Sequence, residues 1–285
     1  MKNILLTGAT SGIGLETART LAKKENNLLI IGRDPVKITA VLNELKSIFP
    51  AGNHKGFTAD LSSQGQIRKV VAEIQSSVSK IDVLINNAGA YFTDQQFSED
   101  AIEMTWATNH LAYMLLTYEL MPLLLKAEKA RIVNVASHSH YKGQINFEDI
   151  ALSKNWNGYK AYEQSKLGNV LFTLELAEKL KGTTISVNAL HPGVVKTDIA
   201  IKNGAWYVRL FWGMVKNFIA ITVEKGAETS IFLATSNDVE GQSGMYFDKC
   251  RQKWQSRFSQ TPGLKEKCWE LSCKQIGLDP MWNFS

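Results

Sequence analysis

Residues 3–14 read NILLTGATSGIG, and this stretch decides the fold. The apolar run at residues 3–6 has the length of a buried strand, and apolar residues at helical spacing follow at residues 15–22. The three glycines between them permit a tight turn and a close approach of the backbone to a phosphate. Because a helix N-terminus attracts anions, this order predicts the start of a dinucleotide-binding βαβ unit. No lysine follows Gly12, which argues against a P-loop nucleotide hydrolase.

Short apolar runs alternate with helical patterns along the whole chain. We expect strands at residues 3–6, 27–31, 56–59, 81–85, 131–135, 184–190 and 245–248. Runs such as VLI and IVNV are apolar on both faces, which is typical of parallel strands covered by helices on both sides. The predicted fold class is α/β, a single doubly wound Rossmann-type domain with a seven-stranded parallel sheet flanked by helices. No Pro-, Gly- or Ser-rich linker interrupts the sequence, so we expect one domain over residues 1–285.

The composition is that of an ordinary globular protein, with 45% hydrophobic and 21% charged residues. The formal net charge of +5 comes from one segment, because residues 249–267 hold six basic residues and one acid. We treat residues 249–285 as a C-terminal extension, and we favour a solvated charged face anchored by Trp254 and Phe258. Contact of this segment with phosphate or a membrane surface is the alternative. No nucleic-acid partner is expected.

Three cysteines without CxxC spacing favour a reducing compartment over a disulfide framework or a zinc site. The first strand begins almost at Met1, which leaves no room for a leader, so we expect a cytoplasmic protein. Residues 205–223 are apolar but contain Arg209 and Lys216. Each of these cations would cost about 2.5 to 3.5 kcal/mol near a bilayer centre, so we expect no transmembrane segment. We predict that residues 200–223 form a substrate lid; packing on the core or on a partner subunit, and contact with a membrane surface, are the alternatives.

The end of the second predicted strand bears on the choice between NAD and NADP. About 20 residues beyond the glycine turn, a dinucleotide fold usually places an acid that bonds the ribose 2′-hydroxyl. Gly32 offers no carboxylate, whereas Arg33 offers a planar fork that suits a 2′-phosphate. Asp34 could be that acid one position late, but it stands before Pro35 and is more typical of a helix N-cap. We therefore expect NADP(H) to be preferred over NAD(H).

Tyr162 and Lys166 stand four residues apart in a helical pattern that continues to Leu180. At that spacing two side chains lie on one helix face, so the ammonium would lower the pKa of the phenol from about 10. Such a tyrosine could act as a general acid toward a carbonyl oxygen. The spacing alone also fits a surface pair. Tyr159 and Lys160 are adjacent and therefore point in different directions.

Six motifs carry a resemblance to a known family. They are TGATSGIG at residues 7–14, NNAG at 86–89, Asn109, NVAS at 134–137, YEQSK at 162–166 and HPG at 191–193. In order and spacing they resemble the short-chain dehydrogenase/reductase family, over nearly the whole chain. Residues 161–197 and 269–278 are similar to its retinol dehydrogenase and WW-domain oxidoreductase branch.

The resemblance implies a role for each residue at a matching position. Tyr162 would be the proton donor or acceptor, Ser137 would bond the substrate oxygen, and Lys166 would hold the nicotinamide ribose and tune Tyr162. Asn109 would help to maintain a proton relay, and these four residues form the candidate catalytic tetrad. The expected cofactor contacts are Thr7, Gly8, Thr10, Ser11, Gly12, Ile13, Gly14, Arg33, Asp60, Leu61, Asn87, Ala88, Gly89, Tyr162, Lys166, Pro192, Gly193, Val195 and Thr197.

Two departures from the family pattern affect these expectations. Where the family usually has two serines this chain has Ala136 and Ser137, so Ser139 would reach the site only after a one-residue loop shift. The retinol branch commonly carries an N-terminal hydrophobic anchor that this chain lacks, so we do not expect a retinoid in particular. No metal is predicted, because the histidines near the tetrad lack a further ligand at metal spacing. Those histidines are His110, His138 and His140.

The predicted function is NADP(H)-dependent hydride transfer between nicotinamide and a carbonyl or alcohol substrate, expected to be a hydrophobic aldehyde, ketone or alcohol. A non-catalytic NADP-sensing protein is an alternative, although it would be expected to have lost a tetrad member. A nucleotide-sugar epimerase or dehydratase shares Tyr-x-x-x-Lys but usually has a TGxxGxxG turn and a larger C-terminal domain. Family members often pair through the helices that carry the positions of Asn109 and Tyr162, so the resemblance implies a candidate homodimer.

Overall fold

The computed structural model describes residues 1–193 and 221–282. The predictions for Val195 and Thr197, and the proposed lid except residues 221–223, lie outside the described residues. Within those ranges no helix is long and apolar enough to cross a membrane.

In the described part of the chain, eight strands form one sheet in the order β3-β2-β1-β4-β5-β6-β7-β8. The strands are β1 (Asn3–Thr7), β2 (Asn27–Gly32), β3 (Lys55–Thr58), β4 (Val83–Asn86), β5 (Ala130–Val135), β6 (Ile185–His191), β7 (Met245–Asp248) and β8 (Arg251–Lys253). Every neighbouring pair from β3 to β7 is parallel. The seven predicted strands and the doubly wound α/β class are therefore confirmed.

The eighth strand corrects the predicted sheet. β8 pairs antiparallel with β7, and its sequence RQK is fully exposed, without the apolar alternation that would indicate a strand. It forms because Lys249 and Cys250 both take positive φ angles, 51° and 57°, and so make a two-residue hairpin turn. Neither residue is the Asn or Gly that usually marks such a turn, so this turn could not be predicted from local sequence patterns.

Helices connect the strands. They are α1 (Gly12–Lys23), α2 (Pro35–Ile48), α3 (Gln64–Ser77), α4 (Met104–Trp106), the π-helical turn η1 (Ala107–Leu111), α5 (Ala112–Leu124), the 3-10 turn η2 (His138–Tyr141), α6 (Gly158–Lys179), α8 (Val223–Thr235), the 3-10 turns η4 (Asn237–Val239) and η5 (Phe258–Gln260), and α9 (Leu264–Ile276). Asp34, Ser63 and Asn157 cap α2, α3 and α6 by accepting hydrogen bonds from first-turn backbone N–H groups. At α1, by contrast, the side chain of Ser11 makes no capping hydrogen bond.

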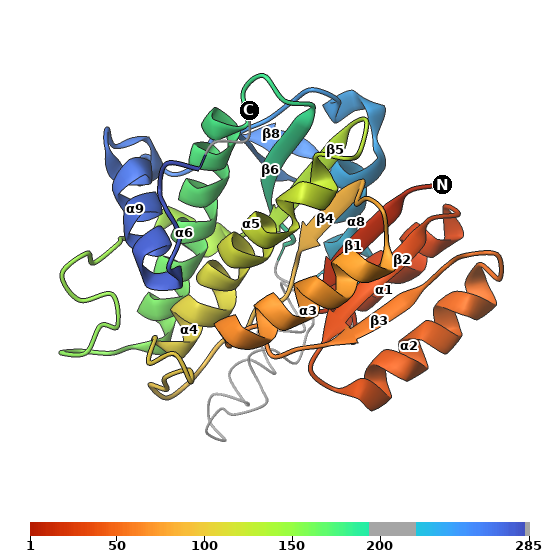
Figure 1. Ribbon diagram of the computed structural model, residues 1–285. Helices are drawn as coiled ribbons and strands as arrows, with labels where there is room; N and C mark the ends of the chain where they lie inside the picture. The colour runs from red at the N-terminus through yellow and green to blue at the C-terminus, as the bar shows by residue number, and fades with distance from the viewer. Residues whose placement is uncertain (194–220, 283–285) are drawn as a thin grey trace.

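The two faces of the sheet bury separate cores. In β1, Ile4 and Leu6 belong to a core that includes buried residues of α1, α2 and α8, whereas Leu5 belongs to a core with those of α3, α5 and α6. This division follows from the alternation of side chains along a strand. Figure 1 shows the sheet between these two layers of helices.

The C-terminal extension adds a further helix outside the sandwich. In Figure 1, α9 lies beside α6, and the two helices are in contact. The ring of Trp269 stacks on that of Phe172 with centroids 6.0 Å apart, and the indole of Trp106 donates to the Gln275 side chain at 2.8 Å. α9 therefore covers part of the helix surface through which the family resemblance implied dimerisation. A homodimer through that surface would require α9 to move.

Candidate active site

The glycine turn between β1 and α1 has the shape that a pyrophosphate needs. Gly8 and Gly12 take positive φ angles of 70° and 54°, which residues with side chains rarely adopt. Gly14 is required for another reason, because a Cβ there would lie 2.2 Å from the carbonyl oxygen of Gly8. Since Ser11 does not cap α1, the first-turn N–H groups and the positive end of the helix dipole can serve an anion. The turn therefore fits a dinucleotide.

The end of β2 separates the roles of Arg33 and Asp34. The Asp34 carboxylate caps α2 by accepting hydrogen bonds from the N–H groups of Val36 and Lys37, at 3.0 and 3.2 Å. This confirms the N-cap interpretation and commits the only acid that could have replaced the missing ribose carboxylate at this strand end. Arg33 has a side chain that is 74% exposed, and its guanidinium lies 4.0 Å from the Asp60 carboxylate. A guanidinium held so weakly can turn toward a phosphate group.

Thr7 joins the end of β1 to the segment that follows β4. Its hydroxyl accepts hydrogen bonds from the N–H groups of Asn87 and Ala88, both at 2.9 Å. The Asn87 amide donates to the Thr7 carbonyl at 2.8 Å. A Cβ on Gly89 would lie 3.4 Å from the Lys166 ammonium. These contacts bring the predicted cofactor segment after β4 against the tetrad.

Asn109 holds that same segment against α6. Its side chain is fully buried, accepts a hydrogen bond from the Ala90 N–H at 2.8 Å and donates to the Ala90 carbonyl at 2.9 Å. Its amide also donates to the Ser165 hydroxyl at 3.2 Å. Asn109 lies in η1, and π-helical turns are rare elements that occur frequently at functional sites. The sequence did not predict this turn.

Ser137 and Tyr162 converge from β5 and α6. Burial raises the pKa of Tyr162, and the neighbouring Ser137 side chain lowers it by a smaller amount. The Ser139 hydroxyl lies 3.3 Å from that of Ser137, and the Ser139 N–H donates to the Ser137 hydroxyl at 3.2 Å. The structure thus brings Ser137 to Tyr162 as the predicted loop register requires, with Ser139 behind it.

Lys166 lies close to the ring of Tyr162 and is 3% exposed. Its ammonium donates to the Val135 carbonyl at 3.0 Å and lies 5.6 Å from the centre of the Tyr162 ring. Burial lowers the pKa of Lys166 to about 7 and raises the pKa of Tyr162. The prediction that Lys166 lowers the pKa of Tyr162 is therefore wrong for the protein alone. Desolvation is the largest cause of both shifts, and it disfavours the charged form of each group.

The remaining predicted cofactor positions follow the ends of strands or lie in the glycine turn. A Cβ on Gly32 would lie 3.1 Å from the methyl group of Thr10, which places the glycine turn against the end of β2. Pro192 and Gly193 directly follow β6. Ile13 belongs to the first turn of α1, and Asp60 and Leu61 come after β3. Open parallel sheets bind ligands at such carboxyl ends of strands.

Three aromatic side chains lie near Tyr162 or near Gly158 at the start of the same helix, and two of them, Tyr91 and Trp156, were not predicted from the sequence. The Tyr91 ring meets that of Tyr162 edge to face at 6.0 Å. The Tyr91 hydroxyl and the Trp156 ring both approach Gly158, where a Cβ would lie 3.3 and 3.2 Å from them. Tyr159 is 45% exposed and close enough to raise the pKa of Tyr91. We call Tyr91, Trp156 and Tyr159 the aromatic wall. They come from irregular segments and a helix start, so no periodic pattern marks them.

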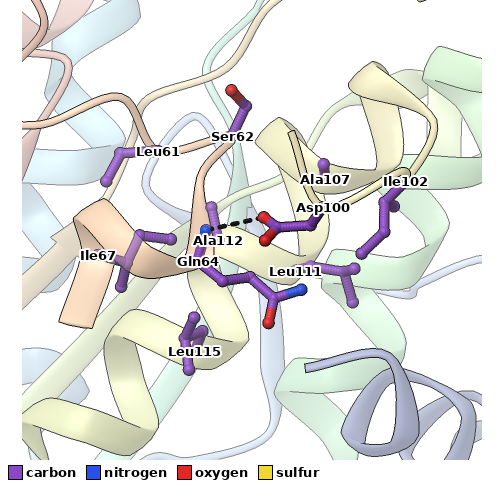
Figure 2. Close-up of a pocket in the computed structure, with 10 residues that line it drawn as sticks. All are labelled: Leu61, Ser62, Gln64, Ile67, Asp100, Ile102, Ala107, Leu111, Ala112 and Leu115. Carbon is purple, nitrogen blue, oxygen red and sulfur yellow. Dashed lines mark hydrogen bonds between the residues drawn. The ribbon is translucent and has the colours of Figure 1, made fainter. Parts of the chain in front are cut away.

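The small cavity in Figure 2 lies apart from this chemistry. It has a volume of about 10 Å³, room for about one water molecule, and none of the tetrad residues lines it. Its lining is mainly apolar, with Leu61, Ile67 and Leu111 among the contributors, and the Gln64 N–H donates to the Asp100 carboxylate at 2.9 Å. This cavity is a packing gap between α3 and the Asn109 helix.

His110 is part of the core next to the tetrad. It is 1% exposed, its Nε2 lies 2.8 Å from the Ser272 hydroxyl of α9, and its Nδ1 lies 3.3 Å from the Asn169 side chain. Burial lowers its pKa to about 3, so the ring is neutral at pH 7. Among residues 1–193 and 221–282, no three His, Cys, Asp or Glu side chains group as metal ligands would.

Comparisons with known proteins agree with this geometry. Residues 2–208 match the family model described as short chain dehydrogenase. The chain is 35% identical over 277 residues to retinol dehydrogenase 12 of Mus musculus, covering 97% of this chain and 87% of that protein. It is 34% identical over 279 residues to retinol dehydrogenase 11 of Homo sapiens, covering 97% and 86%. A crystal structure of an uncharacterized protein from Mycobacterium paratuberculosis matches with a TM-score of 0.79 and 27% identity, covering 99% of this chain and 96% of that one.

Proposed function

Because this chain belongs to the short-chain dehydrogenase family, we propose that it uses NADP(H) to interconvert a hydrophobic aldehyde or ketone and the matching alcohol. At the level of the family it is an oxidoreductase that acts on a CH–OH group with a nicotinamide cofactor. The observation that carries the proposal is the proximity of Ser137, Tyr162 and Lys166 to one another and to the segment after β4 that packs on the glycine turn. An NADP-sensing protein without activity is the weaker candidate, because all four tetrad positions are intact.

The tetrad divides the chemistry among its members. A bound nicotinamide supplies or accepts the hydride. Tyr162 gives a proton to the substrate oxygen or takes one from it, and Ser137 holds that oxygen by a hydrogen bond. The ammonium of Lys166, with its pKa near 7, can carry positive charge when negative charge develops on the Tyr162 oxygen. Asn109 holds the segment that follows β4 against α6.

The preference for NADP(H) is supported by the residues at the end of β2. Gly32 has no side chain to bond a ribose hydroxyl, and the Asp34 carboxylate is committed to the first turn of α2. Arg33 is the exposed cation next to them. A 2′-phosphate would therefore find a planar donor whose one ion pair among the described residues is the 4.0 Å contact with Asp60.

A hydrophobic substrate is supported by the aromatic wall beside Tyr162. Its rings offer apolar area close to the reacting hydroxyl, which suits a bulky aldehyde or ketone. A retinoid is one candidate of this class, because relatives named as retinol dehydrogenases match nearly the whole chain. We therefore give up the expectation against a retinoid. We further propose a cytoplasmic location, which the three free cysteines favour.

The test is NADPH consumption with a panel of aliphatic aldehydes, ketones and all-trans-retinal. Tyr162→Phe should remove turnover and leave NADPH binding nearly intact, because only the acidic hydroxyl is lost. Tyr118→Phe is the matched control, because it removes a tyrosine hydroxyl that lies outside both the tetrad and the aromatic wall, beside Trp282, and should keep the rate. Ser137→Ala should reduce kcat more than Ser139→Ala. Full turnover by Tyr162→Phe would refute the proposal.

A further inference from the structure

His140 occupies a buried position between the active-site loop and the C-terminal extension. It lies in the turn η2, which begins directly after Ser137, and its side chain is fully buried. Its ring packs against those of Tyr141 and Tyr246, with centroids 4.1 and 4.6 Å apart. Its two nitrogens face different segments of the chain: Nδ1 lies 2.7 Å from the Ser137 carbonyl oxygen, and Nε2 lies 3.2 Å from the backbone nitrogen of Ser256.

These two contacts define the protonation of the ring. A carbonyl oxygen can only accept a hydrogen bond, so Nδ1 carries the proton. A backbone N–H can only donate, so Nε2 has a free lone pair. Burial lowers the pKa of His140 to about 4, which keeps the ring neutral at pH 7. The geometry therefore requires the neutral tautomer with hydrogen on Nδ1.

His140 thus bridges Ser137 and Ser256, and the Ser256 end of this bridge is itself held in place. Ser256 is 2% exposed, its hydroxyl accepts a hydrogen bond from the Ser259 N–H at 3.2 Å, and its carbonyl accepts one from the Ser259 hydroxyl at 2.6 Å. Two residues earlier, the Trp254 carbonyl accepts a hydrogen bond from the Tyr141 hydroxyl at 2.5 Å. The segment after β8 thus holds η2 at two points. A histidine that only filled space in the core would not need these two connections.

The Ser137 end of the bridge reaches the proposed chemistry. The Ser137 carbonyl accepts from the backbone N–H of His140 at 3.2 Å as well as from its ring. The side chain of the same residue is close enough to Tyr162 to lower its pKa. A shift of the Ser137 backbone would therefore move the hydroxyl relative to Tyr162, and small displacements of this kind can cost large factors in rate.

We propose that His140 is a positioning residue, which holds the backbone of Ser137 through Nδ1 and is itself held by Ser256 of the C-terminal extension through Nε2. This inference rests on the proposed function, because Ser137 and Tyr162 are taken as the pair that handles the substrate oxygen. His140 touches neither substrate nor cofactor in this role. The C-terminal extension becomes a support for the active site, 116 residues away in sequence from the histidine that it holds.

Two substitutions separate the arms of the bridge. In His140→Asn, the side-chain amide stands where Nδ1 was and can still donate to the Ser137 carbonyl, but it cannot reach Ser256. In His140→Gln, the longer side chain can accept from the Ser256 N–H but has no donor at the Nδ1 position. His140→Phe fills the space and makes neither bond. We expect His140→Gln and His140→Phe to lower kcat by about tenfold, which is about one neutral hydrogen bond. His140→Asn should recover most of that loss.

A double-mutant cycle with Ser137→Ala distinguishes positioning from a merely structural role. If His140 acts through the Ser137 hydroxyl, His140→Gln lowers kcat much less in the Ser137→Ala background than in the unsubstituted protein. Equal factors in both backgrounds would overturn the proposal, as would equal kcat values for His140→Asn and His140→Gln. NADPH affinity and the unfolding midpoint of each variant show whether a variant has lost its fold.

A measurement that needs no turnover tests the tautomer. In protein labelled with ¹⁵N-histidine, long-range proton–nitrogen correlation spectra should show His140 with a protonated Nδ1 and a bare Nε2 at pH 7, with the signal assigned from its absence in His140→Asn. A proton on Nε2 would overturn the inference. Failure of the proposed function has a different signature, because the unsubstituted full chain would then turn over no aldehyde or ketone in the panel.

Discussion

Replacing Arg33 with alanine should weaken NADPH binding and leave NADH binding nearly unchanged. The 2′-phosphate is the group by which the two cofactors differ, and Arg33 is the exposed cation at the strand end that meets the adenosine ribose in this fold. A charge-assisted hydrogen bond contributes about 1.5 to 3 kcal/mol. Because the Arg33 side chain is 74% exposed, the lower part of that range applies. The expected loss is therefore about tenfold in the Kd for NADPH, since about 1.4 kcal/mol corresponds to a factor of ten.

A matched control is available on the next helix. Lys37 is also an exposed cation, with its ammonium 3.6 Å from the Asp34 carboxylate, so Lys37→Ala removes the same charge from the same edge of the sheet. If Arg33 binds the phosphate directly, Lys37→Ala changes the Kd for NADPH much less than Arg33→Ala does. Titration of intrinsic fluorescence with each cofactor measures all the values. Equal weakening for NADPH and NADH, or equal effects of the two substitutions, would refute the assignment of Arg33.

Two further predictions concern the turn and a buried histidine. Gly14→Ala should abolish NADPH binding or destabilise the fold, because its Cβ would lie 2.2 Å from the Gly8 carbonyl oxygen; Gly65→Ala, with its nearest neighbour 3.9 Å away, is the control that should remain stable and bind NADPH in the same titration. His110 has a folded-state pKa of about 3, below its ordinary value of 6.5, so folding favours the neutral ring. Its contribution is complete above pH 6.5 and falls by about 1.4 kcal/mol per pH unit as the pH drops from 6.5 toward 3. Urea unfolding measures the free energy of unfolding at pH 7 and at pH 5. Between these two pH values it should fall by less in His110→Gln than in the unsubstituted protein, and an equal fall in both would contradict the predicted direction.

Local patterns were enough to predict the seven parallel strands and the arrangement of motifs at their ends. Strands such as β1, β2, β4 and β5 are short runs buried on both faces, and helical segments separate the first six strands, so strand type and crossover direction follow from the sequence. The N-cap role of Asp34 was predictable for the same reason, because a carboxylate before a proline is a local signal. The register of the loop after β5 was also local, and it brought Ser137 to Tyr162.

The pKa of Tyr162 was not predictable from spacing. The i, i+4 relation placed Lys166 correctly, but it gave no measure of how far both groups are removed from water. Lys166 is 3% exposed, and at that burial the loss of hydration lowers its pKa to about 7. A lysine can lower the pKa of a nearby phenol only while the lysine is protonated. Depth in the fold, which depends on the packing of α6 against the sheet, decides the sign.

The contacts that connect the C-terminal extension to the active site could not be predicted from local sequence patterns. His110 meets Ser272 across 162 residues of sequence, and His140 meets Ser256 across 116. One histidine adjoins Asn109 and the other follows Ser137, so each joins a tetrad element to a buried serine of the extension. Basic residues on β8 indicated a solvated face, and Arg251 and Lys253 are exposed. The two predicted anchors are exposed as well, Trp254 at 82% and Phe258 at 45%, so the prediction that they anchor the segment is wrong. Its serines are inside, however, and they complete the hydrogen bonding of two neutral rings. The family model ends at residue 208, before Ser256 and Ser272, so each of these contacts joins a histidine inside the family match to a serine outside it.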